Sequence, residues 1–127
     1  MQRATYIRLY ADERGESHFE DVDIALPPVD FAPPAAPLNM APFLATARSF
    51  WLGAPVGWEG GEPHPSPQRQ VFCVLRGEAE VTASDSAVRR FPAGSVLLLE
   101  DTHGKGHATR ITSAEDVLIF GVALADS

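Results

Sequence analysis

Two stretches decide the fold: HPSPQRQVFCVLRGEAEV, residues 64–81, and RRFPAGSVLLLEDTHGKGH, residues 89–107. Each holds an apolar run of strand length next to a turn. Gln70–Leu75 is rich in β-branched and aromatic residues and stops at Gly77, and Val96–Leu99 follows the turn Pro92–Gly94. Such runs bounded by Gly and Pro predict strands joined by tight turns.

Strand signals continue outward from both stretches, and no segment shows helical periodicity over more than about two turns. Strands separated by turn residues at intervals of about 8–12 residues are typical of a sandwich or a barrel, so we predict an all-β fold. The other predicted strands are Thr5–Tyr10, Phe19–Leu26, Ala47–Leu52, Glu78–Thr82, Val88–Phe91, Ala108–Thr112 and Val117–Leu124.

Ten of the eleven prolines lie between Pro27 and Pro67. Proline lacks an N–H and fixes φ, so Pro27–Pro42 is predicted to be an irregular arm that packs on the barrel; a disordered linker is the alternative. We expect one domain, with residues 1–45 forming N-terminal strands and the arm and residues 46–127 forming the barrel.

Composition excludes several classes of protein. The 127 residues carry a formal charge of −7, which disfavours nucleic acid as a partner because its backbone is bound through basic patches. The single cysteine, Cys73, excludes an internal disulfide framework and a Cys-rich zinc module. No apolar run approaches the ~20 residues that cross a bilayer, and the N-terminus has no secretory core, so we expect a cytoplasmic protein without membrane contact.

The stretch at residues 64–81 resembles the first motif of the cupin superfamily, G-x5-H-x-H-x3/4-E-x6-G. Counting back from Gly77 places Gln70 at the glutamate of that motif, Ser66 at its second histidine and His64 at its first. The resemblance covers about residues 46–124. It implies a cupin jelly-roll (double-stranded β-helix) barrel.

The second stretch resembles the second cupin motif, G-x5-P-x-G-x2-H-x3-N, less closely. Gly94 leads to Glu100 where the family has proline, and Lys105 occupies the histidine position. If the turn before it carries two extra residues, the histidine is His107. The metal ligands that the resemblance implies are therefore His64, Gln70 and His107.

These departures change the expected metal chemistry. Two imidazoles and a carboxylate suit Fe(II) or Mn(II), whereas the neutral amide of Gln70 leaves more of the ion's charge uncompensated. We expect either one divalent transition metal (Zn, Ni, Mn or Fe) or none. Without a metal, His107 would act as a base while Gln70 orients the substrate.

Strand alternation assigns faces to the residues around Gln70. Gln70, Phe72 and Val74 share one face, which we expect to line the barrel, and Cys73 and Arg69 share the other. Cys73 is then a small buried apolar residue, and Arg69 is expected to pair with an acid.

Four further residues are candidates for a role at the barrel. His103 is a candidate acid or base, although a solvated loop position is the simpler interpretation. Glu100 or Asp101 could transfer protons, although acids in turns are usually solvated. Trp51 could contact a planar substrate, although packing is the simpler role.

The sequence thus favours a small cupin that binds an organic molecule. It would be an isomerase or lyase, metal-assisted or not, with oxygenation least favoured because the carboxylate ligand is missing. The alternatives are a non-catalytic binding or sensing module and a structural dimer-forming module. Small cupins commonly pair, so a homodimer is expected.

Overall fold

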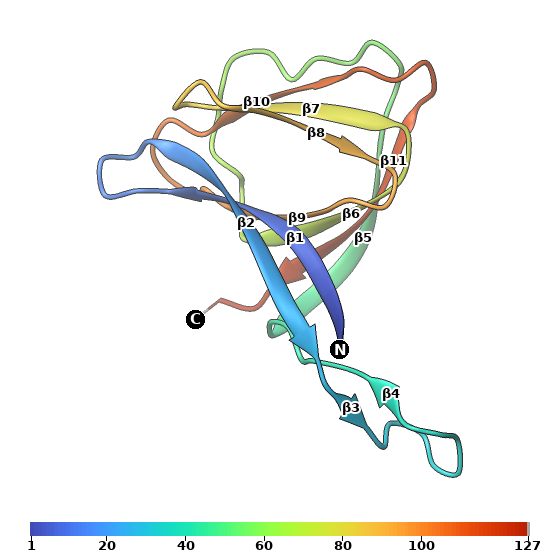
Figure 1. Ribbon diagram of the computed structural model, residues 1–127. Coiled ribbons are helices and arrows are strands. Elements are labelled where there is room, and N and C mark those ends of the chain that lie inside the picture. Colours follow the sequence, from blue (N-terminus) through green and yellow to red (C-terminus); the bar gives the residue numbers. More distant parts are fainter. Residues whose placement is uncertain (127) are drawn as a thin grey trace.

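The computed structural model describes residues 1–126, and these form strands and turns with no helix, which confirms the all-β prediction (Figure 1). The longer strands are β1 (Gln2–Ala11), β2 (Ser17–Leu26), β5 (Thr46–Ala54), β6 (Gln70–Arg76), β7 (Glu78–Ala83), β8 (Val88–Pro92), β9 (Val96–Glu100), β10 (His107–Ile111) and β11 (Val117–Leu124). Two short strands, β3 (Pro28–Val29) and β4 (Leu38–Asn39), pair with each other inside the proline-rich arm. No helix long and apolar enough to cross a membrane occurs among the described residues.

Two sheets build the barrel. The larger one has the order β2-β1-β9-β6-β11-β5, and the smaller one has the order β10-β7-β8. All neighbouring strands of these two sheets are antiparallel except β1 and β9, which are parallel. Because sequentially distant strands are neighbours, the fold depends on long-range pairing; for example, Val71 of β6 lies opposite Leu98 of β9.

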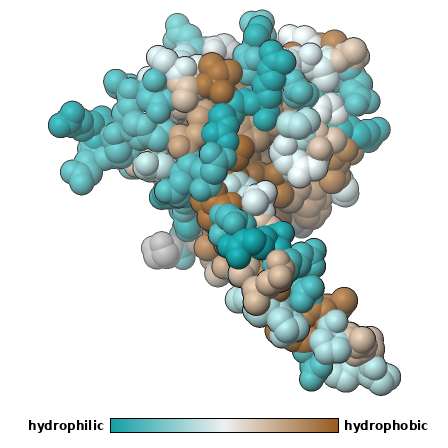
Figure 2. Space-filling view, viewed as in Figure 1, coloured by the Kyte–Doolittle hydropathy of each residue, from teal (hydrophilic) through white to brown (hydrophobic). Residues whose placement is uncertain are grey.

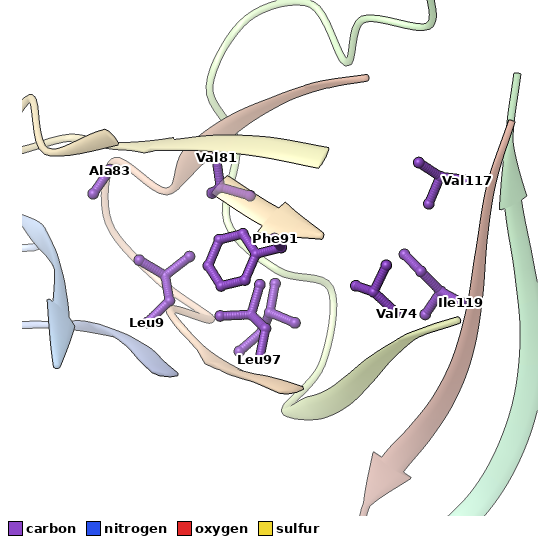
Figure 3. Close-up of a cluster of buried hydrophobic side chains, with 9 residues drawn as sticks. Leu9, Val74, Val81, Ala83, Phe91, Leu97, Val117 and Ile119 are labelled. Carbon is purple, nitrogen blue, oxygen red and sulfur yellow. The ribbon is translucent and has the colours of Figure 1, made fainter. Parts of the chain in front are cut away.

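The core lies between the two sheets. Alternate residues of each strand point inward, because successive side chains of a strand face opposite sides. Figure 3 shows these side chains in the space between the strands. The buried members of this cluster are Leu9, Val74, Val81, Ala83, Phe91, Leu97, Leu99, Val117 and Ile119.

A smaller apolar cluster lies on the outer face of the larger sheet. It contains the buried side chains of Val71, Leu98 and Leu124, with Cys73 packed against them. Cys73 therefore faces away from the barrel interior, as alternation predicts, and burial raises the pKa of its thiol above the usual value. A partly buried thiol with a raised pKa acts as a packing residue and not as a reactive thiolate.

The proline-rich arm projects from the barrel as a narrow hairpin made by β3 and β4 (Figures 1 and 2). At its base, the ring of Phe43 packs edge-on against Tyr6 with centroids 5.0 Å apart. Farther out the apolar side chains are exposed, Phe31 by 61% and Leu38 by 54%. The homodimer stays a prediction.

The turn between β1 and β2 holds the loop that precedes β10. The Lys105 amide donates to the Gly15 carbonyl at 2.8 Å, and the Ser17 hydroxyl donates to the Gly106 carbonyl at 2.7 Å. Lys105 Nζ also lies 2.9 Å from a carboxylate oxygen of Glu16. The N-terminal strands thereby help to position His107, the first residue of β10.

Among the described glycines, Gly106 leaves the least room for a Cβ atom. This residue has φ +71°, and a Cβ built on it would lie 2.0 Å from the carbonyl carbon of His64. The approach lets His64 and His107 exchange two backbone hydrogen bonds, of 3.0 and 3.1 Å. Only glycine meets both requirements, a positive φ and no side chain.

We predict that Gly106→Ala destabilises the protein by about 2 kcal/mol or more, because it combines backbone strain with a collision against His64. The matched control is Gly61→Ala: Gly61 has a similar φ of +78°, but nothing lies within 4 Å of its added Cβ. Urea unfolding of both variants measures the difference. Equal losses of stability would show that the close approach at Gly106 is not a constraint.

His18 links the N-terminal hairpin to the turn between β7 and β8. Its Nε2 lies 2.7 Å from a carboxylate oxygen of Asp12, and its Nδ1 lies 2.9 Å from one of Asp85. Both hydrogen bonds raise the pKa of His18 above the usual value of an imidazole, and the bond to Asp12 has the larger effect. The reason is that the imidazolium can donate to both acids.

A raised pKa in the folded state predicts a pH-dependent contribution to stability. The contribution is complete below the unfolded-state pKa of about 6.5 and is lost as the pH rises through the folded-state pKa. In urea unfolding, the wild type is therefore expected to exceed His18→Gln in stability at about pH 5.5 by more than at about pH 9. A difference that is the same at both pH values would contradict this prediction.

Candidate functional site

A cavity of about 650 Å³ lies between the two sheets, within the size range of small-molecule sites. Most of its wall is apolar and consists of the inward residues of successive strands. These residues are Phe50, Leu52, Ala54, Phe72, Val74, Ala79, Val81, Phe91, Leu97, Leu99, Ile111, Val117 and Ile119, with Trp58 from the loop after β5. An organic molecule with an apolar body would replace water against this wall favourably.

A strip of hydrogen-bonded polar side chains runs along one part of the wall. Arg48 Nη2 donates to Gln68 Oε1 at 3.4 Å, and Gln68 Nε2 donates to Gln70 Oε1 at 3.3 Å. Gln70 Nε2 donates to Ser66 Oγ at 3.0 Å, and that hydroxyl donates to the Gln68 carbonyl at 2.7 Å. All four residues line the cavity, and their mutual bonds fix the direction in which each amide points.

His107 lines the cavity next to this strip and is held from behind by Asp101. Its Nδ1 lies 2.5 Å from Asp101 Oδ2, and Asp101 is fully buried without being part of the cavity wall. A carboxylate can only accept a hydrogen bond, so Nδ1 carries the proton. The Asp101 carboxylate thereby leaves Nε2 as the ring nitrogen that is available to a bound molecule.

His64 lies beside His107, with ring centroids 5.7 Å apart. Its Nδ1 donates to the Pro65 carbonyl at 3.0 Å, so Nε2 is again the free nitrogen. The backbone bridge made possible by Gly106 brings the two imidazoles together from segments 43 positions apart in sequence.

The side chains present do not fit a resident metal ion with three protein ligands. Within residues 1–126, no group of three His, Cys, Asp or Glu side chains is arranged to hold an ion. Gln70, the third predicted ligand, already has its carbonyl oxygen and its amide engaged by Gln68 and Ser66. The predicted Zn, Ni, Mn or Fe ion stays a prediction.

The structure separates the other predicted site residues into two groups. Phe72 lines the cavity beside Gln70, as strand alternation predicts. Trp51 lies outside the cavity wall, is 66% exposed and packs edge-on against Phe120, because alternation along β5 turns Phe50 inward and Trp51 outward. His103 is exposed in the loop before β10 and does not line the cavity.

The two acids at the end of β9 have different surroundings. Glu100 accepts hydrogen bonds from Arg8 at 2.6 Å and from Arg69 at 2.7 Å, so the expected pairing of Arg69 with an acid is confirmed. Burial alone would raise the pKa of Glu100, but the two guanidinium groups outweigh it and hold the pKa below its usual value. Glu100 is thus favoured as the anion, and it joins β1 and β9 to Arg69, the residue before β6.

Sequence reasoning missed Asp101 as the partner of His107 and did not consider Arg48. A usable signal for Asp101 was its place six residues before His107 across a turn with two glycines. A signal for Arg48 was its position two residues before Phe50 in the predicted strand, which puts both on one face.

Comparison with known proteins supports the fold alone. No family model matches the sequence, and no curated protein matches it either. Among solved structures, the chain is similar to the Schizosaccharomyces pombe Cnp3 cupin domain, with a TM-score of 0.50 and 16% identity over 99% of this chain and 86% of that one. A putative ethanolamine utilization protein Q from Salmonella typhimurium is also found, with a TM-score of 0.40 and 13% identity over 98% of each chain.

The Cnp3 likeness agrees with the all-β architecture and with the motif resemblance of residues 46–124. The chain therefore has the cupin fold, an all-β jelly-roll barrel.

Proposed function

We propose that this small cupin-fold protein binds an organic molecule in its barrel and that His107 transfers a proton to or from that molecule, as in an isomerase or a lyase. The observation that carries the proposal is the His107–Asp101 pair: an imidazole on the wall of an apolar cavity, with its far nitrogen bonded to a buried carboxylate. The predicted roles of Gln70 and Phe72 follow from their places on the same wall.

The pair supplies what general acid–base catalysis requires. Asp101 fixes the tautomer and the orientation of the ring, so Nε2 can accept a proton without first reorganising. The imidazolium formed is stabilised by the same carboxylate at 2.5 Å. A cavity wall of low polarity strengthens these electrostatic interactions compared with water.

The second candidate is binding without catalysis, as in a sensing module. It is favoured by the hydrogen bonds that engage both ends of the Gln70 amide, because an amide held by Gln68 and Ser66 is less free to assist a reaction. The two candidates share the cavity and differ in whether His107 acts on its contents.

Binding in the cavity can be tested with N-phenyl-1-naphthylamine, a neutral apolar fluorophore. The chain has two tryptophans, so Trp51→Phe leaves Trp58, which lines the cavity, as the single tryptophan donor. We expect saturable energy transfer from Trp58 to the dye. Ala54→Phe, which adds a ring inside the cavity, should weaken dye binding at least about fivefold, a free-energy change of about 1 kcal/mol.

The matched control for this experiment is Ala47→Phe, an exposed position on the other side of β5. It adds the same ring outside the cavity and should leave dye affinity unchanged. Equal effects of the two substitutions, or no saturable transfer in the parent protein, would contradict binding in the barrel.

Proton abstraction can be tested with 5-nitrobenzisoxazole, a small neutral compound that a single base opens to a coloured cyanophenolate. His107 Nε2 would take the proton on carbon as the N–O bond breaks. We expect His107→Gln to lower the protein-catalysed rate at least about tenfold and Asp101→Asn to lower it by a smaller factor, because general base catalysis contributes about 10²–10⁴ in rate. Because the base is an imidazole, EDTA should leave the rate unchanged.

Ala47→Phe again serves as the control and should retain the full rate. If the fluorophore binds in the cavity but His107→Gln does not change the rate, the acid–base assignment is wrong and the binding module is the better description. A rate that disappears with EDTA and returns with added Zn, Ni, Mn or Fe would instead establish the metal-dependent alternative.

A further inference from the structure

The ionisable side chains that line the cavity are all basic. The chain as a whole has 17 acidic residues and 10 Lys and Arg residues, yet no Asp or Glu occurs among the described residues of the cavity wall. The ionisable side chains on that wall are Arg48, His64 and His107. Basic side chains thus line the cavity of a protein that is acidic as a whole, and two of them, Arg48 and His64, are exposed.

Arg48 is the permanent cation of this set and has unused donors. It lies on β5 on the same face as Phe50, with its guanidinium carbon 5.9 Å from the centroid of that ring. Its hydrogen bond to a side chain is the long contact of 3.4 Å to Gln68. Among residues 1–126, no carboxylate lies within ion-pairing distance of Arg48.

The two acids that follow the cavity residue Leu99 are already paired with basic side chains. Glu100 is paired with Arg8 and Arg69, and Asp101 is bonded to His107. An anion that enters the cavity therefore meets no uncompensated carboxylate on the described wall, and it meets a guanidinium whose planar fork matches a carboxylate.

We propose that the molecule bound in the barrel is an organic anion, with an apolar body against the aliphatic wall and an acidic group at Arg48. This inference rests on the proposed binding function and names the class of ligand. The hydrogen-bonded strip from Arg48 through Gln68 and Gln70 to Ser66 then runs between the anchored acid and the residues beside His107. Ser66 is joined to Asp101, the partner of His107, by a backbone hydrogen bond of 3.0 Å.

Two dyes that share one skeleton separate the contributions of charge and apolar body. N-phenyl-1-naphthylamine is neutral, and 8-anilinonaphthalene-1-sulfonate carries a sulfonate on the same rings. We expect Arg48→Gln to raise the Kd of the sulfonate about fivefold and to leave that of the neutral dye unchanged, since a partly exposed charge contact is worth about 1 kcal/mol. Arg48→Lys, which keeps the charge without the fork, should restore part of the affinity.

The matched control is Arg14→Gln, which removes the same charge from an exposed position in the turn between β1 and β2. It should change neither Kd. Ala54→Phe should weaken binding of both dyes, which identifies the signal as coming from the cavity and not from apolar outer surfaces.

The outcomes distinguish this inference from the function on which it rests. If both dyes bind in the cavity and Arg48→Gln shifts neither Kd, or shifts both equally, the anion assignment is overturned while the binding function stands. If Arg14→Gln weakens the sulfonate as much as Arg48→Gln does, general charge and not Arg48 is responsible. If neither dye binds in the cavity, the proposed function itself fails.

Discussion

The contact between Gly106 and the backbone of His64 is the constraint on which the rest of the site depends. It lets the loop before β6 and the start of β10 form a two-bond bridge, which sets the two imidazoles side by side. The turn of the N-terminal hairpin supports this bridge from the other side through Lys105 and the Gly106 carbonyl. Three segments, the turn of the N-terminal hairpin, the loop before β6 and the start of β10, therefore combine to place His107.

The burial of Asp101 constrains the orientation of the neighbouring His107 ring. A carboxylate removed from water is costly unless donors compensate for it. His107 Nδ1 compensates Oδ2, whereas Oδ1 is buried without a hydrogen-bond partner among the described residues. The pair has a second effect, because the orientation that compensates the acid also directs the free nitrogen of the ring to the cavity. The same hydrogen bond thus engages one oxygen of the buried acid and sets the orientation of the His107 ring.

Much of the fold could be predicted from the sequence, because alternation and turn residues act locally. The strand from Gln70 and the strand from Val117 follow directly from β-branched runs bounded by turns, and the two motifs indicated the barrel. The cavity face of Gln70, Phe72 and Val74 also follows from the period of two. Local patterns do not show which of two adjacent aromatic residues turns inward, so Trp51 was a candidate where the structure turns Phe50 to the cavity.

The site was harder to predict than the fold, because its chemistry depends on burial. Asp101 lies in a turn, where acids are usually solvated, and only the three-dimensional packing shows that it is enclosed. Gln70 occupies a family ligand position, but its hydrogen bonds to Gln68 and Ser66 are invisible in a motif. Arg48 differs from other exposed arginines because it lines the cavity, and a sequence pattern does not show this.

The β3–β4 hairpin is a segment in which changes of sequence and length should be tolerated. None of residues 27–45 lines the cavity, and the hairpin extends away from both sheets (Figure 1). Segments with few contacts to a core accept changes in length and composition readily. The hairpin is therefore the place where this chain can change in length or sequence, or accept an inserted peptide, without altering the lining of the cavity.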